Sequence, residues 1–334
     1  MKLKPQYILA ISALIMVGMI ALEMVRPCFF SRGDLRCYKQ KDPWFRAHYN
    51  PAISPFLTPD KASFYRITEY MKDSQLTDLL PASLASLAGI HAYSISNRSS
   101  DGSARLCAVI GNSDNLNGSG YGEMIDRHDI VFRMNNAVTS GREYDVGSKT
   151  SFHVVHEWIY NLESKREIPD LDKSAITVLN VYSSLRSPRD FYFNMQSLIQ
   201  QVHGFAPLTQ PYADNLRFPK NIAVFKGRFF LTDPEFVRYV QEEWFRVFAP
   251  KGDGQKVPSI GFFTLVMAFH LCDSVSIFGF SPPDAKGRWG HYFEQVTRRV
   301  PFRHHADQQW DLIVEMHERG IITLHSKALR EKSY

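Results

Sequence analysis

The chain has 334 residues, of which 39 are basic and 34 are acidic, giving a formal net charge of +5. Hydrophobic residues make up 44% and charged residues 22%, which is ordinary for a globular protein and excludes a collagenous or prion-like chain. The mild charge, without clustered Lys and Arg among aromatic residues, argues against nucleic acid as a partner and suits an anionic small substrate or a membrane-facing surface.

An apolar stretch opens the chain. Residues 7–22 are apolar apart from Ser12, and the stretch continues past Glu23. Because about 18 helical residues can just cross a bilayer core, a transmembrane anchor is predicted over 7–25. A cleaved signal peptide is the alternative, but the small-x-small cleavage pattern is missing. The protein is then type II, with a cytoplasmic tail over 1–6, although more basic residues follow the stretch than precede it.

The segment 26–60 is rich in Pro, Arg and aromatic residues and has no helical or strand period, so it is predicted to be a stem before a globular domain over 61–334. Two sequons, at Asn97 and Asn117, permit glycosylation. The four cysteines form no Cys-x-x-Cys pair, which argues against structural zinc, while an even count permits disulfides: Cys28, Cys37, Cys107 and Cys272.

Strands and helices alternate along the rest of the chain, which predicts an α/β domain with a largely parallel sheet. Asp233 and Ser259 are predicted helix caps. Strands are predicted over 106–110, 130–134, 150–156, 176–182, 222–225, 274–279 and 321–324. Helical signals cover 61–72, 81–87, 234–248, 261–271 and 311–319.

The first chemically suggestive pattern follows the strand at 106–110. Glycine at 111 is followed by Asn112 and Ser113, a glycine-rich stretch and a helical segment. At the carboxyl edge of a parallel sheet, glycine lets a phosphate approach the backbone, and the two side chains supply donors. An ordinary β–α turn explains the same residues equally well.

Two further patterns allow ligand contacts. The strand at 130–134 ends in a pair of carboxamides that includes Asn135, which could contact a base or ribose or simply form a turn. The helix at 261–271 is apolar on every side and therefore predicted to be buried. Its start, with Ser259 and Gly261, could present free N–H groups to a phosphate.

Histidines gather in the last third of the chain, in His291-Tyr-Phe-Glu294 and His304-His-Ala-Asp307. A histidine can remove a proton from a sugar hydroxyl, and a second can stabilise a leaving phosphate. Zinc binding and simple surface exposure remain equal alternatives at this point. The Asp170-Leu-Asp172 triplet is assigned to a solvated loop.

Four blocks together resemble the eukaryotic sialyltransferase family and its motifs L, S, III and VS. The long motif matches from Cys107 to about residue 152, the short motif spans 258–279, and the last two are the histidine blocks at 291 and 304. They occur in the family's order over about 200 residues. The long motif is most similar to enzymes making α2,3 links to Gal-β1,3-GalNAc, and the block at 291 to those making α2,6 links to GalNAc.

The resemblance implies a modified Rossmann-like single domain (a GT-A-like variant) behind a transmembrane helix in the Golgi membrane, with the catalytic domain lumenal. It implies inverting transfer of sialic acid from CMP-sialic acid to a terminal galactose or N-acetylgalactosamine of a glycoprotein or glycolipid, with no metal. His304 is then the general base and His291 the phosphate-stabilising histidine. Donor contacts are expected from Asn112, Ser113, Asn135, Ser259 and Gly261, and a disulfide from Cys107 to Cys272.

Some positions depart from the family pattern. Gln309 stands where the VS motif usually has glutamate, and His305 offers a second register for the base. Two alternatives therefore stay open: a different sugar donor, such as galactose or a keto-acid sugar, and a catalytically silent glycan-binding relative. An NAD-linked oxidoreductase is disfavoured because the chain lacks a complete glycine fingerprint.

Overall fold

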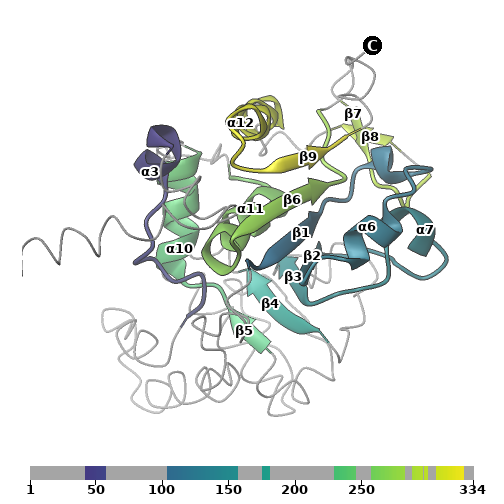
Figure 1. Ribbon diagram of the computed structural model, residues 1–334, viewed down its shortest axis with the longest axis horizontal. Helices are drawn as coiled ribbons and strands as arrows, with labels where there is room; N and C mark the ends of the chain where they lie inside the picture. The colour runs from purple at the N-terminus through teal and green to yellow at the C-terminus, as the bar shows by residue number, and fades with distance from the viewer. Residues whose placement is uncertain are drawn as a thin grey trace, which may run out of the picture.

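The computed structural model describes residues 42–57, 104–156, 175–180, 229–245, 257–282, 288–295, 297–299 and 306–326. Its centre is a seven-stranded sheet in the order β5-β4-β3-β2-β1-β6-β9, in which every neighbouring pair is parallel (Figure 1). A separate antiparallel pair, β7 and β8, lies beside it. The predicted α/β domain with a largely parallel sheet is confirmed.

The central strands follow the apolar runs of the sequence. The strands of the large sheet are β1 (Leu106–Ile110), β2 (Ile130–Met134), β3 (Phe152–His156), β4 (Ile176–Asn180), β5 (Phe229–Leu231), β6 (Ser274–Phe278) and β9 (Thr323–His325). The small pair is β7 (Arg288–Gly290) and β8 (Thr297–Arg299). The predicted strand at 222–225 lies outside the described residues, and β5 is a strand that was not predicted.

The order of the strands creates a reversal next to β1. From β1 the chain moves outward through β2, β3, β4 and β5, and then returns to place β6 on the other side of β1. In open parallel sheets such a reversal is where ligands bind, at the carboxyl ends of the two strands. The residues that follow Ile110 and Phe278 are therefore the first candidates for a ligand-binding site.

Side chains of β1 alternate between two hydrophobic layers because successive residues of a strand point to opposite faces. Val109 belongs to the larger core, together with the residues of α11 (Ile260–Leu271). Ala108 and Ile110 belong to the smaller core under α6 (Gly122–Asp126) and α7 (Glu143–Val146). Figure 1 shows α11 on one side of the sheet and α6 and α7 on the other.

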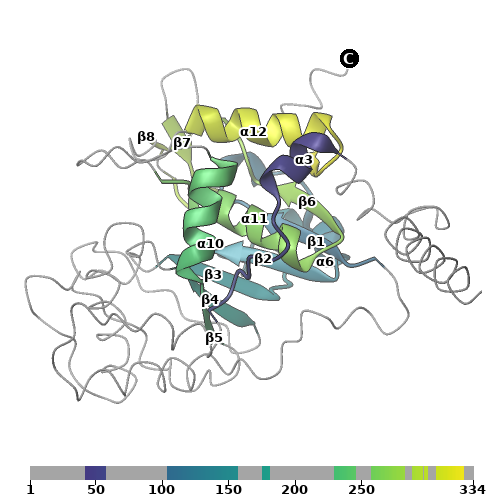
Figure 2. The same cartoon turned by 90° about the vertical axis from the view of Figure 1, so that its left-hand side faces the viewer.

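Helix α11 is buried almost throughout and packs on β1, β2, β3 and β6. In Figure 2, α10 (Pro234–Tyr239) and α12 (Ala306–Glu318) lie on the same side of the sheet as α11. The predicted helix at 234–248 begins as expected, with Asp233 accepting from the N–H of Glu235 at 2.8 Å. It then continues as a π-helix, η6 (Val240–Trp244). Helix α12 starts five residues earlier than the predicted 311.

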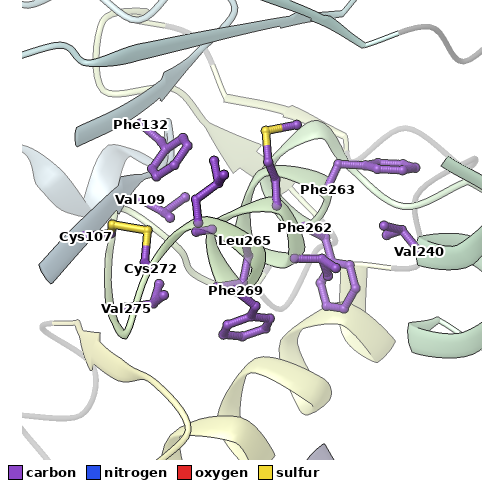
Figure 3. Close-up of a cluster of buried hydrophobic side chains, with 14 of the residues drawn as sticks. Cys107, Val109, Phe132, Val240, Phe262, Phe263, Leu265, Phe269, Cys272 and Val275 are labelled. Atoms are coloured by element: carbon purple, nitrogen blue, oxygen red, sulfur yellow. A yellow bond between two sulfur atoms is a disulfide. The ribbon is translucent and has the colours of Figure 1, made fainter. Parts of the chain in front are cut away.

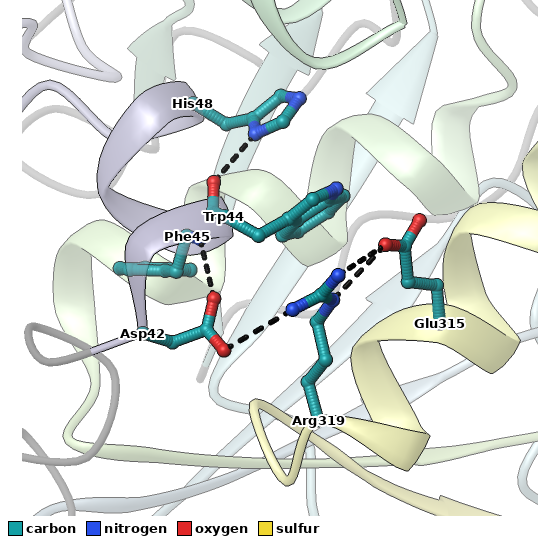
Figure 4. Close-up of polar contacts among 6 residues, drawn as sticks. All are labelled: Asp42, Trp44, Phe45, His48, Glu315 and Arg319. Atoms are coloured by element: carbon teal, nitrogen blue, oxygen red, sulfur yellow. Dashed lines mark hydrogen bonds and ion pairs between the residues drawn. The ribbon is translucent and has the colours of Figure 1, made fainter.

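A short helix interrupts the segment that was predicted to be a stem. Helix α3 (Pro43–His48) is capped by Asp42, which accepts from the N–H of Phe45 at 2.9 Å. Arg319, just after α12, lies over the ring of Trp44 and pairs with Asp42 at 3.5 Å and with Glu315 at 2.9 Å (Figure 4). The segment 26–60, predicted to be a stem because it shows no helical or strand period, thus contains α3, whose cap and first turn are held by groups far along the chain.

The expected disulfide is present. Cys107 at the start of β1 is bonded to Cys272 at the end of α11, with their Cα atoms 6.0 Å apart (Figure 3). The bond fixes the end of the buried helix against the central strand. Among the described residues no helix combines the length and apolar character needed to span a membrane. The predicted anchor at 7–25, together with Cys28 and Cys37, lies outside the described ranges.

Candidate active site

The turn after β1 and the turn after β6 touch through their backbones. The N–H of Gly111 donates to the carbonyl of Phe278 at 2.7 Å, and the N–H of Ser113 donates to Gly279 at 3.0 Å. A Cβ on Gly111 would lie 2.2 Å from the carbonyl oxygen of Gly279, which is far inside van der Waals contact. Glycine is thus required here for the two carboxyl ends at the strand reversal to approach each other.

Asn112 and Ser113 are both buried at this edge. The Asn112 amide donates to the carbonyl of Met134 at the end of β2, at 3.2 Å. Its Oδ1 is buried and has no partner within the described part of the chain. The hydroxyl oxygens of Ser113 and Ser281 lie 2.6 Å apart, so one donates to the other. Asn112 therefore keeps an acceptor available at the reversal, whereas the hydroxyl of Ser113 is committed to the protein.

His291 lies directly against this turn, as an isolated antiparallel bridge to Ser113. The N–H of Tyr292 donates to the carbonyl of Asn112 at 3.0 Å. The Nδ1 of His291 is 3.0 Å from an oxygen of Glu294, a distance at which a protonated imidazole pairs with the carboxylate. The imidazole also stacks on Phe293, with 4.9 Å between ring centroids. These contacts hold the ring at the carboxyl edge of the sheet.

Tyr292, the residue after His291, holds this segment in place through its side chain. Its hydroxyl donates to the carbonyl of Val138 at 2.7 Å, and burial raises its pKa to about 12. The phenol therefore stays neutral at physiological pH and serves as a fixed donor. It links the loop after β2 to the segment that carries His291.

The start of α11 reaches the same place. A Cβ on Gly261 would lie 3.1 Å from the ring of Phe280 and 3.6 Å from the sulfur of Met134, and a Cβ on Gly111 would lie 3.1 Å from that same ring. The turn after β1 and the helix start therefore flank one aromatic ring. Within the described residues, the backbone N–H groups of Ile260 and Gly261 have no hydrogen-bond acceptor. The Oγ of Ser259 accepts from the N–H of Phe262 at 3.3 Å.

Asn135 sits at the end of β2 in the left-handed region, with φ of 49°. Its Oδ1 accepts from the N–H of His156 at 3.0 Å, which ties the ends of β2 and β3 together. It follows Met134, whose carbonyl binds Asn112, so the two asparagines are neighbours in space. Asn135 thus forms the turn that was considered for it, and only the nitrogen of its side-chain amide is left to contact a ligand.

Two charged residues support the site without reaching it. Asp145 accepts from the N–H groups of Gly118 and Gly120 at 2.8 and 2.9 Å, and so shapes the glycine-rich loop after β1. Arg133 is buried and donates to the carbonyl of Val146 at 2.7 Å. Burial lowers the pKa of Arg133, and the carboxylate of Asp126 acts in the opposite direction.

The structure thus brings together Asn112, Ser113, Asn135, Gly261 and His291 around the strand reversal. Ser259 is present as the helix cap. His304 and Asn97 lie outside the described residues. Asn117 is exposed, and its Oδ1 accepts from Arg142 at 3.1 Å. The roles of Phe280, Ser281 and Glu294 were not predicted, although the three-residue spacing of His291 and Glu294 was a usable signal.

No set of three or more His, Cys, Asp or Glu side chains suited to a metal ion occurs in the ranges that the structure describes. Metal independence of the reaction remains a prediction.

Comparison with known proteins identifies this arrangement. The family model of glycosyltransferase family 29 (sialyltransferase) matches residues 52–321. The chain belongs to this family. CMP-N-acetylneuraminate-beta-galactosamide-alpha-2,3-sialyltransferase 1 of Gallus gallus is 31% identical over 266 residues, which are 78% of this chain and 70% of the relative. The Homo sapiens protein of the same name is 30% identical over 298 residues, covering 84% and 77%.

A solved structure supports the same assignment. The crystal structure of a mammalian sialyltransferase aligns with a TM-score of 0.62 at 26% identity, over 90% of this chain and 99% of the other. The same kind of enzyme in complex with Gal-beta-1-3GalNAc-ortho-nitrophenol aligns with a TM-score of 0.59 at 27% identity, over 85% and 94%. The protein is therefore a glycosyltransferase of the sialyltransferase class.

Proposed function

We propose that the protein transfers sialic acid from CMP-sialic acid to a terminal galactose or N-acetylgalactosamine of a glycoprotein or glycolipid glycan. The observation that carries this proposal is the meeting of Gly111, the start of α11 and His291 around the strand reversal. The family supplies the reaction class, and two relatives act on beta-galactosamide acceptors by their names.

The single phosphate of CMP would lie at this meeting point. Unpaired N–H groups at a helix start favour an anion, and Ile260 and Gly261 offer two of them. Asn112 supplies a buried acceptor for a hydroxyl of the nucleotide or sugar. When His291 is protonated, Glu294 balances its charge, and the imidazolium stabilises the phosphate as the bond to the sugar breaks.

His304 is assigned as the general base that takes the proton of the acceptor hydroxyl. In the sequence it stands two residues before the start of α12, whose first turn contacts the start of α11 through Gln309. A base that acts on the acceptor hydroxyl and an imidazolium that stabilises the leaving phosphate together support a single displacement. A single displacement inverts the anomeric centre. This chemistry places no step on a metal ion.

A panel of nucleotide sugars tests the proposal. The protein should release CMP from CMP-sialic acid when an asialoglycan is supplied, and the product should carry sialic acid. Turnover of another nucleotide sugar instead would assign a different donor, and CMP binding without any transfer would indicate a silent glycan-binding relative. His304→Ala should abolish transfer while His305→Ala retains it; the reverse result would assign the base to His305.

The chain is further proposed to be a single-pass type II protein of the Golgi membrane, anchored by residues 7–25 with the catalytic domain in the lumen. The apolar stretch of the sequence and the disulfide between Cys107 and Cys272 support this location, because disulfides persist in oxidising compartments. Protease protection of a tagged C-terminus in sealed Golgi vesicles tests the orientation. Digestion of that tag without detergent would contradict it.

A further inference from the structure

Gln309 makes the contact that fixes the start of α11. Its Oε1 accepts from the backbone N–H of Ser259 at 2.9 Å and from the hydroxyl of Ser259 at 2.6 Å. The side chain is buried, at 6% exposure, in the first turn of α12. One amide oxygen thus receives two hydrogen bonds from the cap residue of the neighbouring helix.

These bonds determine how the Ser259 hydroxyl is used. With its proton directed at Gln309, the oxygen keeps its lone pairs for the N–H of Phe262, at 3.3 Å. The cap, the first turn of α11 and the first turn of α12 therefore form one connected unit. The N–H groups of Ile260 and Gly261 project from the part of α11 that this unit holds.

We propose that Gln309 is a positioning residue for donor binding, which acts through Ser259 to hold the N–H groups at the start of α11 in place. This inference rests on the proposed function, because it assumes that those groups receive the phosphate. The chain needs an acceptor oxygen at this position rather than a negative charge, so a neutral amide serves where the family usually has a carboxylate. A carboxylate would accept the same two bonds.

The test compares two substitutions of nearly equal shape in the full chain. Gln309→Met removes the acceptor oxygen, and Gln309→Glu keeps it. Because two hydrogen bonds to the cap are lost, Gln309→Met should raise the KM for CMP-sialic acid about tenfold and leave the KM for the acceptor unchanged. Gln309→Glu should stay within about threefold of the parent for both substrates. Ser259→Ala combined with Gln309→Met should raise the donor KM by less than the product of the single effects.

Gln308 provides the matched control on the same helix. Its Nε2 donates to the carbonyl of Phe245 at 3.0 Å, away from the cap of α11. Gln308→Met removes a partly buried hydrogen bond of the same helix and should leave the KM for the donor unchanged. An equal rise in the donor KM for Gln308→Met and Gln309→Met, or for Gln309→Met and Gln309→Glu, would overturn the proposal.

Amide hydrogen exchange without donor separates this inference from the proposed function. The peptide containing residues 257–262 should exchange faster in Gln309→Met than in the parent, and at the parental rate in Gln309→Glu and Gln308→Met. This result is expected whether or not the parent transfers sialic acid, so an inactive parent would refute only the proposed function. Unchanged exchange in Gln309→Met would refute the positioning role.

Discussion

The disulfide between Cys107 and Cys272 should contribute a large part of the stability of the catalytic domain. The two residues are 165 positions apart, and closing a loop of that length removes chain entropy worth about 5 kcal/mol from the unfolded state. Measured losses for native disulfides are usually smaller, about 2–5 kcal/mol. Both cysteines are buried, at 0% and 7% exposure, so reduction in the folded state should be slow.

The assay is urea unfolding of a form that begins at residue 42, in which Cys107 and Cys272 are the only cysteines. We expect the free energy of unfolding to fall by about 2–5 kcal/mol when both are replaced by alanine. The parent, unfolded and refolded under reducing conditions, is the matched control because it keeps the sulfur atoms and loses only the bond. A loss below about 1 kcal/mol in both samples would refute the argument.

Three other predictions concern burial and close packing. A form that begins at residue 58 lacks the buried side chains of Phe45 and Phe56, each worth roughly 3–5 kcal/mol, and should fail to be secreted, whereas a form that begins at 42 is secreted and active. His270 is partly buried, and this burial lowers its pKa from 6.5 to about 4, so the folded state should lose up to about 3 kcal/mol of stability as the pH falls from 6.5 to 4, and His270→Phe should lessen that loss. Gly111→Ala places a Cβ 2.2 Å from a backbone oxygen and should lower both the melting temperature and CMP affinity; unchanged values would contradict the close approach.

Much of the fold could be predicted because its central strands are short, mostly apolar runs. The runs at 106–110 and 130–134 form the neighbouring parallel strands β1 and β2, and the run at 176–182 contains β4, which is separated from β2 by β3. The order of the strands depends on contacts between distant segments. It was not accessible from periodicity, and the short strand β5 has too few residues to show a period.

The errors have local causes. Helix α3 is only six residues long, which is too short to show a hydrophobic period, and its start signal, Asp42 followed by Pro43, was missed. The helix at 234–248 becomes a π-helix after Tyr239, a change that hydrophobic spacing does not reveal.

The candidate site was predicted mainly through the family resemblance. From the residues alone, an ordinary β–α turn explained Asn112, and zinc binding or surface exposure explained His291. Only the fold shows that the two residues lie at the same edge of the sheet. Residues that act by contact were harder to find. Gln309 was notable only as a departure from the motif, and its bonds join it to Ser259, a residue 50 positions away in the sequence.

The most direct test of the account is a crystal structure of the protein bound to CMP. The phosphate is expected to lie against the N–H groups of Ile260 and Gly261, beside Gly111 and within reach of the imidazole of His291. A phosphate bound elsewhere on the domain, away from the carboxyl ends of β1 and β6, would contradict it.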